Sequence, residues 1–270
     1  MPTLQAIIFD MDGTLADTED IHRQAFNLSF GEFGLDWEWQ PAEYHDLLAI
    51  SGGKERIRNY LEKRGVLRDK KKARWKLADA IHKRKSAIYR ELLGADHIRL
   101  RDGVERLISE AHRLGIDLGI ATSSSRSNVE TLLGATLGKE SLSLFTTIVT
   151  CDVVEDKKPS PAVYQYALAE LGRVCEDCVA IEDTRNGNLA ARAAGLTTVI
   201  TTHAYSLDND FEGAALVVSS LGEPEWPFEV LRGDAHGAGL IDVALLDALL
   251  QAGTGSHVEA WAADVAVAGK

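Results

Sequence analysis

Five short apolar segments recur along the chain, and polar residues follow each of them. The segments are Gln5–Phe9, Asp117–Ala121, Leu144–Thr150, Cys178–Ile181 and Thr197–Thr201. Apolar and polar residues do not alternate regularly within these segments. Such uninterrupted apolar runs are typical of strands that are buried on both faces of a parallel sheet. The chain therefore predicts five strands, each ending at a polar position.

Helical patterns separate these strands and end at glycines. Gly103–Leu114 has apolar residues three and four positions apart, as on one face of a helix. Pro161–Leu171 begins with a proline, which fits the first turn of a helix, and Gly187–Ala194 also stops before a glycine. Strands that alternate with helices predict an α/β fold built on a doubly wound parallel sheet.

Residues 17–90 break this alternation, because they contain helical patterns and no strand candidate. We interpret them as an all-helical cap domain inserted after the first strand. The core would then comprise residues 1–16 and 91–232, and residues 233–270 would add an amphipathic helix and a tail. Helices inserted at this point would lie over the strand ends, where open α/β sheets bind ligands.

Charge is distributed unevenly along the chain. The stretch from Asp69 to Lys85 is strongly basic, whereas the 270 residues together carry a net charge of −12. The basic stretch favours a solvated helix face, with a partner surface as the alternative. The acidic total argues against a nucleic-acid ligand, because such binding depends on neutralising phosphates. It is compatible with a local pocket for a small anion.

The composition is typical of an ordered protein from a reducing compartment. Hydrophobic residues make up 45% of the chain, which is enough for a substantial core. The pair Cys175 and Cys178 fits two reduced thiols better than half of a metal site, because no second pair is present. The first residues form neither a signal core nor a membrane span, so we expect no membrane partner and a cytoplasmic location. The oligomeric state is open, with a monomer as the working expectation.

The first predicted strand runs into the motif FDMDGTL, which contains Asp10 and Asp12. Two carboxylates in this position can converge on one metal ion and one phosphorus atom. One of them can attack a phosphoryl group, while the other exchanges protons with the leaving group and with water. Gly13 permits the tight turn that brings backbone N–H groups towards a phosphate. An Asx-type turn is the structural alternative.

Hydroxyl and lysine side chains follow further along the chain. Thr122, Ser123 and Ser124 come directly after the second strand, where hydroxyls and backbone amides can hold a phosphate oxygen or simply cap a helix. Lys158 is the first residue of KPSP and lies just before the predicted helix. From there it can neutralise both a carboxylate and a phosphate. Taken alone, Lys158 fits a surface lysine better.

Glu182 and Asp183 end the fourth strand. Paired carboxylates at a buried strand end are costly unless they meet a cation, although a pair of helix-capping acids is the alternative. Mg²⁺ takes oxygen ligands from carboxylates, phosphate and water. All four clusters lie at or beside the carboxyl ends of parallel strands, which converge on one crevice. The sequence therefore predicts a magnesium-dependent phosphoryl-transfer site.

These motifs resemble those of the haloacid-dehalogenase superfamily, namely FDMDGTL, the Thr-Ser turn, KPSP and IEDT. Within it, the chain is similar to CbbY-like phosphatases and, more distantly, to β-phosphoglucomutases. The closer similarity rests on HRQAFN, FGLDWEW, ISGGKERI and KKPSPAVYQYAL. The resemblance spans residues 4–205.

The resemblance implies roles for the acidic residues. Asp10 would be the nucleophile that forms an aspartyl phosphate, and Asp12 the general acid and base. Asp10, the backbone carbonyl of Asp12 and Asp183 would bind Mg²⁺, with Glu182 assisting directly or through water. Because true dehalogenases lack the acid at position 12, the chain is expected to be a phosphatase.

The same resemblance assigns phosphate-binding residues. Thr122 would bind the transferring phosphoryl group together with Ser123 and Ser124, and Lys158 would offset its charge.

Cap residues would select the substrate. Glu19 and His22 would reach sugar hydroxyls, and Lys85 is a weaker candidate. A basic loop would hold a second phosphate through Gly52, Gly53, Lys54 and Arg56. This loop equally fits a helix start with exposed cations. CbbY-like enzymes are associated with xylulose 1,5-bisphosphate, an inhibitor of Rubisco in the Calvin cycle, so a sugar bisphosphate is the expected substrate.

Two other functions fit the same sequence. A phosphosugar mutase would use the same aspartyl phosphate, provided that cap closure excludes water. A smaller phosphate monoester could also be the substrate of a phosphatase. A catalytically silent binding protein on this fold is disfavoured by the intact motif set.

Overall fold

The computed structural model describes residues 3–95 and 98–252 of the chain. Within them lies a seven-stranded sheet in the order β3-β2-β1-β4-β5-β6-β7, parallel except for the β6–β7 pair. The strands are β1 (Ala6–Phe9), β2 (Asp117–Ala121), β3 (Thr147–Val149), β4 (Cys178–Glu182), β5 (Thr197–Thr201), β6 (Leu216–Val218) and β7 (Val230–Gly233). The predicted parallel α/β sheet is confirmed, with β6 and β7 added at one edge.

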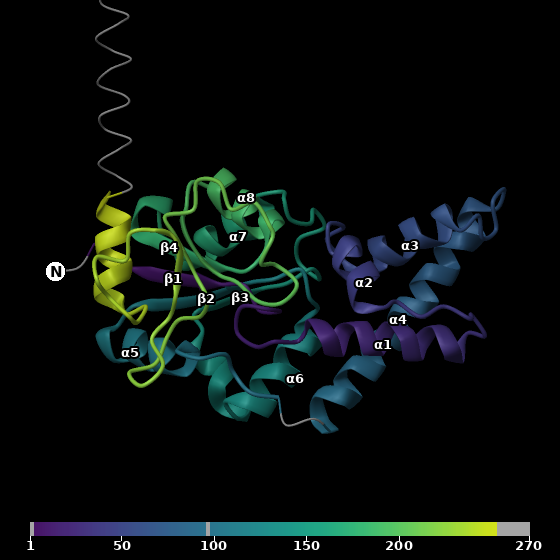
Figure 1. The fold of residues 1–270 in the computed structure, drawn as a ribbon, viewed down its shortest axis with the longest axis horizontal. Helices are drawn as coiled ribbons and strands as arrows, with labels where there is room; N and C mark the ends of the chain where they lie inside the picture. The colour runs from purple at the N-terminus through teal and green to yellow at the C-terminus, as the bar shows by residue number, and fades with distance from the viewer. Residues whose placement is uncertain (1–2, 96–97, 253–270) are drawn as a thin grey trace, which may run out of the picture.

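Helices cover both faces of this sheet (Figure 1). They are α5 (Val104–Leu114), α6 (Arg126–Thr136), α7 (Ala162–Leu171), α8 (Arg185–Ala193) and the helical residues 243–252. The side chains of β1 alternate between the two layers. Ile7 and Phe9 join the cluster that includes α5 and α6, and Ala6 and Ile8 join the cluster with α7 and α8. The sheet is therefore doubly wound, as the apolar strand pattern predicted.

Two predicted boundaries differ from the structure. The third strand covers only Thr147–Val149, because the 3₁₀ helix η1 (Lys139–Leu144) occupies the residues before it. A second 3₁₀ helix, η2 (Cys175–Asp177), precedes β4. Helix α8 begins two residues earlier than expected, since the hydroxyl of Thr184 accepts a hydrogen bond from the N–H of Gly187 and caps the helix.

Between β1 and α5 the described residues, 10–95 and 98–103, form helices, connecting loops and isolated bridges but no named strand. The helices are α1 (Glu19–Glu32), α2 (Pro41–Leu47), α3 (Gly53–Lys63) and α4 (Lys71–Ala95). In Figure 1 they project from the strand ends of the sheet. Aromatic rings fill their own apolar cluster, with Trp39 in contact with Phe26, Phe30 and Tyr60. We call α1–α4 the cap helices, and α4 continues five residues beyond the predicted boundary at residue 90.

The cap and the sheet are joined by two adjacent chain segments. Ala16 lies in the segment that leads from β1 to the cap, and Leu100 lies in the segment that leads from the cap to α5. The two residues form an antiparallel bridge. The backbone N–H of Arg101 also donates to the carbonyl oxygen of Leu15 at 2.9 Å. The two chain segments that connect the sheet to these helices therefore run side by side.

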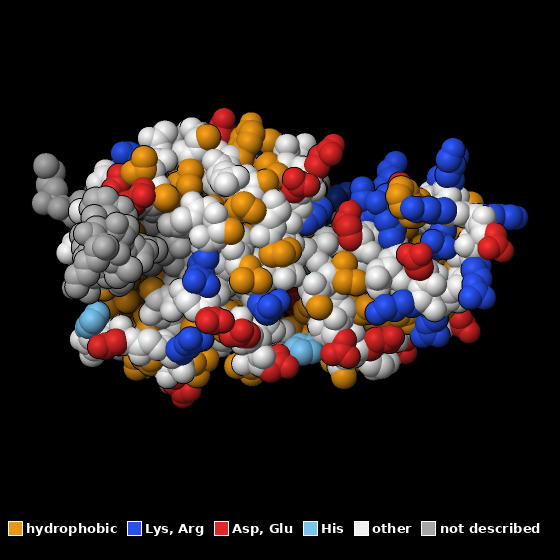
Figure 2. Space-filling view, turned by 90° about the horizontal axis from the view of Figure 1, so that it is seen from above, with side chains coloured by type: hydrophobic (Ala, Val, Ile, Leu, Met, Phe, Trp, Pro, Cys, Tyr) orange, Lys and Arg blue, Asp and Glu red, His pale blue; other side chains and the backbone are white. Residues whose placement is uncertain are grey.

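Basic side chains gather at the end of the cap (Figure 2), over α3 and α4. The exposed ones include Lys63, Arg64, Arg68, Lys70, Lys71, Lys72 and Lys76. Across residues 3–95 and 98–252, no helix has both the length and the apolar content that a membrane span requires.

Burial in β1 gives a testable prediction for stability. Replacing Ile7 with alanine leaves a void between fully buried side chains, and we expect a loss of about 2–5 kcal/mol in the free energy of unfolding, measured by urea denaturation. Leu231→Ala is the control, because Leu231 on β7 is 49% exposed and its loss should cost less than about 0.5 kcal/mol. Equal losses in the two variants would contradict this account of the core.

Candidate active site

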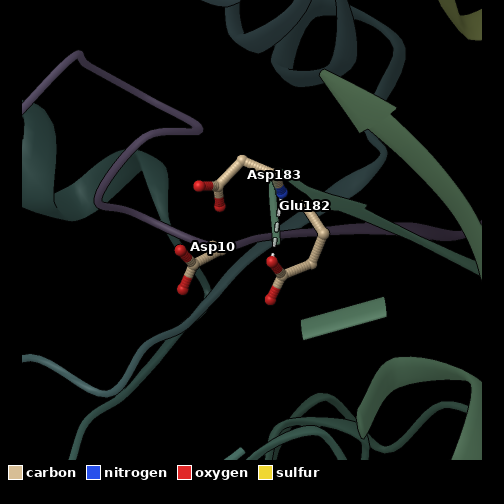
Figure 3. Close-up of side chains that lie close together, drawn as sticks. All are labelled: Asp10, Glu182 and Asp183. Atoms are coloured by element: carbon tan, nitrogen blue, oxygen red, sulfur yellow. Dashed lines mark hydrogen bonds between the residues drawn. The ribbon is translucent and has the colours of Figure 1, made fainter. Parts of the chain in front are cut away.

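Three buried carboxylates meet at the carboxyl ends of β1 and β4. Ligand oxygens of Asp10, Glu182 and Asp183 all lie within 4.8 Å of one another, and the three side chains point into a common space (Figure 3). Burial, followed by the negative charges of Glu182 and Asp183, raises the pKa of Asp10 well above its usual value, against the effect of Lys158. An all-oxygen cluster with too little positive charge is the donor set that Mg²⁺ prefers, so these residues fit that ion.

Lys158 supplies the cation that the structure contains at this site. Its Nζ donates to Oδ1 of Asp10 at 2.6 Å and also to Oε1 of Glu182. The hydroxyl of Tyr164 donates to the same Glu182 oxygen at 2.6 Å. Burial opposes the charge of Lys158, but the two carboxylates outweigh it and raise the pKa of its ammonium group. Lys158 is therefore a buried ion-pair partner and not a surface lysine.

Asp183 is oriented by two neighbours. Thr14 donates its hydroxyl to Oδ1 at 3.0 Å, and His203 Nε2 lies 2.8 Å from Oδ2. The N–H of Tyr205 donates to His203 Nδ1, which places the His203 proton on Nε2, as a donor to Asp183. Gly13 is required here, because its φ is +85° and a Cβ would come within 2.3 Å of Asp183 Oδ2.

Asp12 turns away from the acidic cluster and towards the cap. Its Oδ1 accepts from Thr18 (2.6 Å) and Tyr89 (3.1 Å) and lies 3.0 Å from His22 Nε2, while Oδ2 accepts from Ser124 (2.6 Å). Burial alone would raise the pKa of Asp12, but the charge of His22 and these hydrogen bonds lower it. Asp12 is thus held as a carboxylate, and its side chain contacts both the core and the cap.

His22 lies between Asp12 and Lys85, another candidate residue of the cap. The ring of His22 stacks on Tyr89 at 3.9 Å between centroids, and its Nδ1 lies 2.5 Å from Lys85 Nζ. Lys85 is buried near the ring of Phe26. Burial lowers the pKa of Lys85 to about 7.

Thr122 and the following serines lie where the sequence predicted, after β2. The Thr122 hydroxyl accepts from the N–H of Ser124 at 3.0 Å, so the two residues form one turn. Ser123 and Ser124 line the same cavity as Asp10, and α6 starts just beyond, after Ser125.

That cavity has a volume of about 360 Å³ and extends from Asp10 to the cap loop. Glu19 lines it, and Tyr44 donates its hydroxyl to Glu19 Oε2 at 2.9 Å. Gly52 and Gly53 form the opposite wall, and the φ of Gly52 is +89°. Lys54 lines the cavity beside them.

Arg56 occupies the cavity wall but serves the fold of the cap. Its guanidinium donates to the carbonyl oxygens of Leu47 (3.0 Å) and Ile50 (3.2 Å) and to the hydroxyl of Tyr44 (3.1 Å). Lys157, which the sequence did not single out, also lines the cavity, and it packs against Gly52. Lys54 and Lys157 therefore add positive charge to the cavity lining near the Gly52 loop.

His82 reports the resulting positive potential. Burial, followed by the charges of Lys85, Lys54 and Lys157, lowers the pKa of His82 to about 3. The neutral ring lines the cavity at its basic end. A cavity lined both by a carboxylate nucleophile candidate and by several lysines can accept an anionic ligand.

Several site residues escaped the sequence analysis. Thr14 and Thr18 lie within or beside the first motif, so their position was the available signal. Tyr164 lies within the quoted segment KKPSPAVYQYAL without having been singled out, whereas no local pattern marks Tyr89 or His203.

Lys85 gives a prediction for the pH dependence of stability. Its pKa is about 7 in the folded protein and about 10.5 in the unfolded chain, so the unfolded chain binds more protons between these values. Stability from this group therefore rises with pH across that window, by up to about 5 kcal/mol. In urea unfolding from pH 6.5 to 9, Lys85→Met should remove this rise, while Lys83→Met, at an exposed position of α4, should keep it. Parallel curves for Lys85→Met and the unsubstituted chain would refute the assignment.

Comparison with known proteins places this geometry in a family. The family described as haloacid dehalogenase-like hydrolase matches residues 4–195. The chain is 44% identical over 238 residues to protein CbbY (plasmid) of Cupriavidus necator, which covers 86% of this chain and 92% of that protein. It is 42% identical over 221 residues to protein CbbY of Cereibacter sphaeroides, covering 82% and 94%.

A solved structure leads to the same family. The crystal structure of a CbbY mutant from Rhodobacter sphaeroides in complex with xylulose-(1,5)bisphosphate superposes with a TM-score of 0.73 at 38% identity, covering 80% of this chain and 94% of that one. The motifs, the fold and these relatives agree. The chain is a phosphatase that belongs to the haloacid dehalogenase-like hydrolases and is similar within them to the CbbY proteins.

Proposed function

We propose that the protein is a Mg²⁺-dependent phosphatase that hydrolyses a sugar bisphosphate, with xylulose 1,5-bisphosphate as the first candidate. The observation that carries the proposal is the single cavity that Asp10 lines together with the cations Lys54 and Lys157. It has room for a sugar between two phosphate groups. The CbbY relative bound to xylulose-(1,5)bisphosphate supports this substrate class. The cytoplasmic location expected from the sequence stays a prediction.

In the first step, a carboxylate oxygen of Asp10 attacks phosphorus, and the P–O bond to the sugar breaks. Asp12 gives its proton to the departing sugar oxygen. Asp12 must gain that proton beforehand, and the incoming phosphate favours this because its negative charge raises the pKa of a neighbouring carboxyl group. Lys158 holds Asp10 in place and offsets the charge of the phosphoryl group.

In the second step, Asp12 takes a proton from water, and the water oxygen attacks phosphorus. The bond between phosphorus and Asp10 breaks, so inorganic phosphate leaves and Asp10 is restored. Asp10, Asp183 and the Asp12 carbonyl, with support from Glu182, would hold Mg²⁺, which would supply positive charge to the phosphoryl oxygens when bound. Thr122, Ser123 and Ser124 would hold those oxygens through hydroxyl and amide groups, while Glu19 and His22 would contact sugar hydroxyls.

Phosphate release tests this function. We expect purified protein with Mg²⁺ to release inorganic phosphate from xylulose 1,5-bisphosphate, and both chelation of Mg²⁺ and Asp10→Asn to lower the rate by more than about 10³-fold. β-Glucose 1-phosphate is the second substrate, because conversion of it to glucose 6-phosphate without phosphate release would instead identify a phosphosugar mutase. Release only from simple aryl phosphates would overturn the bisphosphate assignment.

The basic end of the cavity gives a separate prediction. Lys157→Met and Lys54→Met should each raise KM for xylulose 1,5-bisphosphate about 10-fold, equivalent to about 1.4 kcal/mol, because each removes a cation facing the distal phosphate. KM for p-nitrophenyl phosphate, which has no second phosphate, should stay within about 2-fold. Lys76→Met is the control on the exposed face of α4. Equal effects on both substrates would show that these lysines do not read the second phosphate.

A further inference from the structure

Arg101 lies where the chain returns from the cap helices to the sheet. Its side chain reaches the loop that follows β1. Its side chain is only 9% exposed. One terminal nitrogen, Nη1, donates to the carbonyl oxygen of Gly13 and to the Thr201 carbonyl (3.2 Å) and hydroxyl (3.1 Å). The other, Nη2, donates to the carbonyl oxygens of Thr202 (2.5 Å) and Ser219 (3.0 Å). One guanidinium therefore joins the loop after β1 to the ends of β5 and β6.

The contact with Gly13 reaches the acidic cluster directly. Gly13 lies one residue after Asp12 and packs so closely on Asp183 that a Cβ would not fit between them. The remaining Arg101 nitrogen, Nε, lies 3.5 Å from a carboxylate oxygen of Asp17, in the segment that leads out to the cap. The planar five-donor fork of arginine suits several fixed carbonyl oxygens, which a lysine ammonium cannot match.

We propose that Arg101 is a positioning residue for phosphoryl transfer. Its fork fixes the loop of residues 11–16 against the ends of β5 and β6, so that Asp12 and the carboxylate of Asp183 keep their places around the phosphoryl group. This rests on the proposed function for the roles of Asp12 and Asp183. Arg101 touches no reacting atom and acts through the Gly13 backbone.

Arg106 provides a matched control within the same chain. Its Nη2 also donates to three carbonyl oxygens, those of Leu221 (3.0 Å), Gly222 (3.0 Å) and Ile241 (2.9 Å). None of these acceptors belongs to the loop after β1 or to a residue of the cavity. Arg106→Gln therefore removes a similar clamp from the fold and leaves the candidate site unaltered.

The experiment compares Arg101→Gln with Arg106→Gln in the full chain. We expect both to lower Tm, but only Arg101→Gln to lower kcat by about 100-fold with little change in KM, because a small displacement of catalytic groups has that effect. Calorimetric titration with Mg²⁺ alone should show about 10-fold weaker binding for Arg101→Gln and unchanged binding for Arg106→Gln. Arg101→Lys keeps the charge without the fork and should remain at least about 10-fold below the unsubstituted chain in kcat.

Equal effects of the two glutamine variants on kcat and Mg²⁺ affinity, or full activity in Arg101→Lys, would overturn the proposal. If Arg101→Gln does not fold, Arg101→Lys against Arg106→Lys gives the same comparison. The Mg²⁺ titration is independent of the identity of the sugar. Failure of the unsubstituted chain to hydrolyse xylulose 1,5-bisphosphate would thus count against the proposed function, whereas unchanged Mg²⁺ affinity in Arg101→Gln would count against the role of Arg101.

Discussion

The ion pair of Lys158 with Asp10 and Glu182 is the interaction on which the site depends. Buried carboxylates at this spacing repel one another, and one ammonium group cannot balance all of them. A bound divalent cation would offset this surplus negative charge. Tyr164 and Lys158 both bind Glu182, so that carboxylate is fixed mainly by the protein, and the remaining coordination capacity lies with Asp10 and Asp183.

The fold produces this concentration of charge through the parallel order of its strands. β1 lies between β2 and β4, so their polar carboxyl ends open on the same edge, and the covering helices leave that edge free. The cap covers this edge and contributes basic side chains to the cavity that the acidic residues line. Its aromatic cluster gives it an independent core, and Lys54 and Lys85 face the acidic strand ends across the cavity. Asp12 contacts both parts through Ser124 on one side and His22 on the other.

The strands and most of the catalytic candidates could be predicted from the sequence because both leave local signals. A strand buried on both faces is apolar throughout, and its end is marked by the polar residues that follow. Side-chain partners distant in the chain leave no such signal. The Arg101 side chain donates hydrogen bonds to residues that lie 88 to 118 positions away in the chain. His203 lies in a loop, and only the fold brings it to Asp183. Arg56 illustrates a related limit of sequence-based prediction. Its charge could be predicted from the sequence, but its burial against Tyr44 could not.

The pairing of Ala16 with Leu100 also bears on how this architecture can vary. The chain leaves the sheet and returns to it at neighbouring points, so the helices between them form one continuous insertion, which also contacts the core through the His45–Asp208 and Tyr205–Asp20 pairs. Helices of another size or shape could be exchanged between those points while the acidic edge stayed intact. Substrate choice and bond chemistry would then evolve as separate modules, coupled only where a residue such as Asp12 touches both.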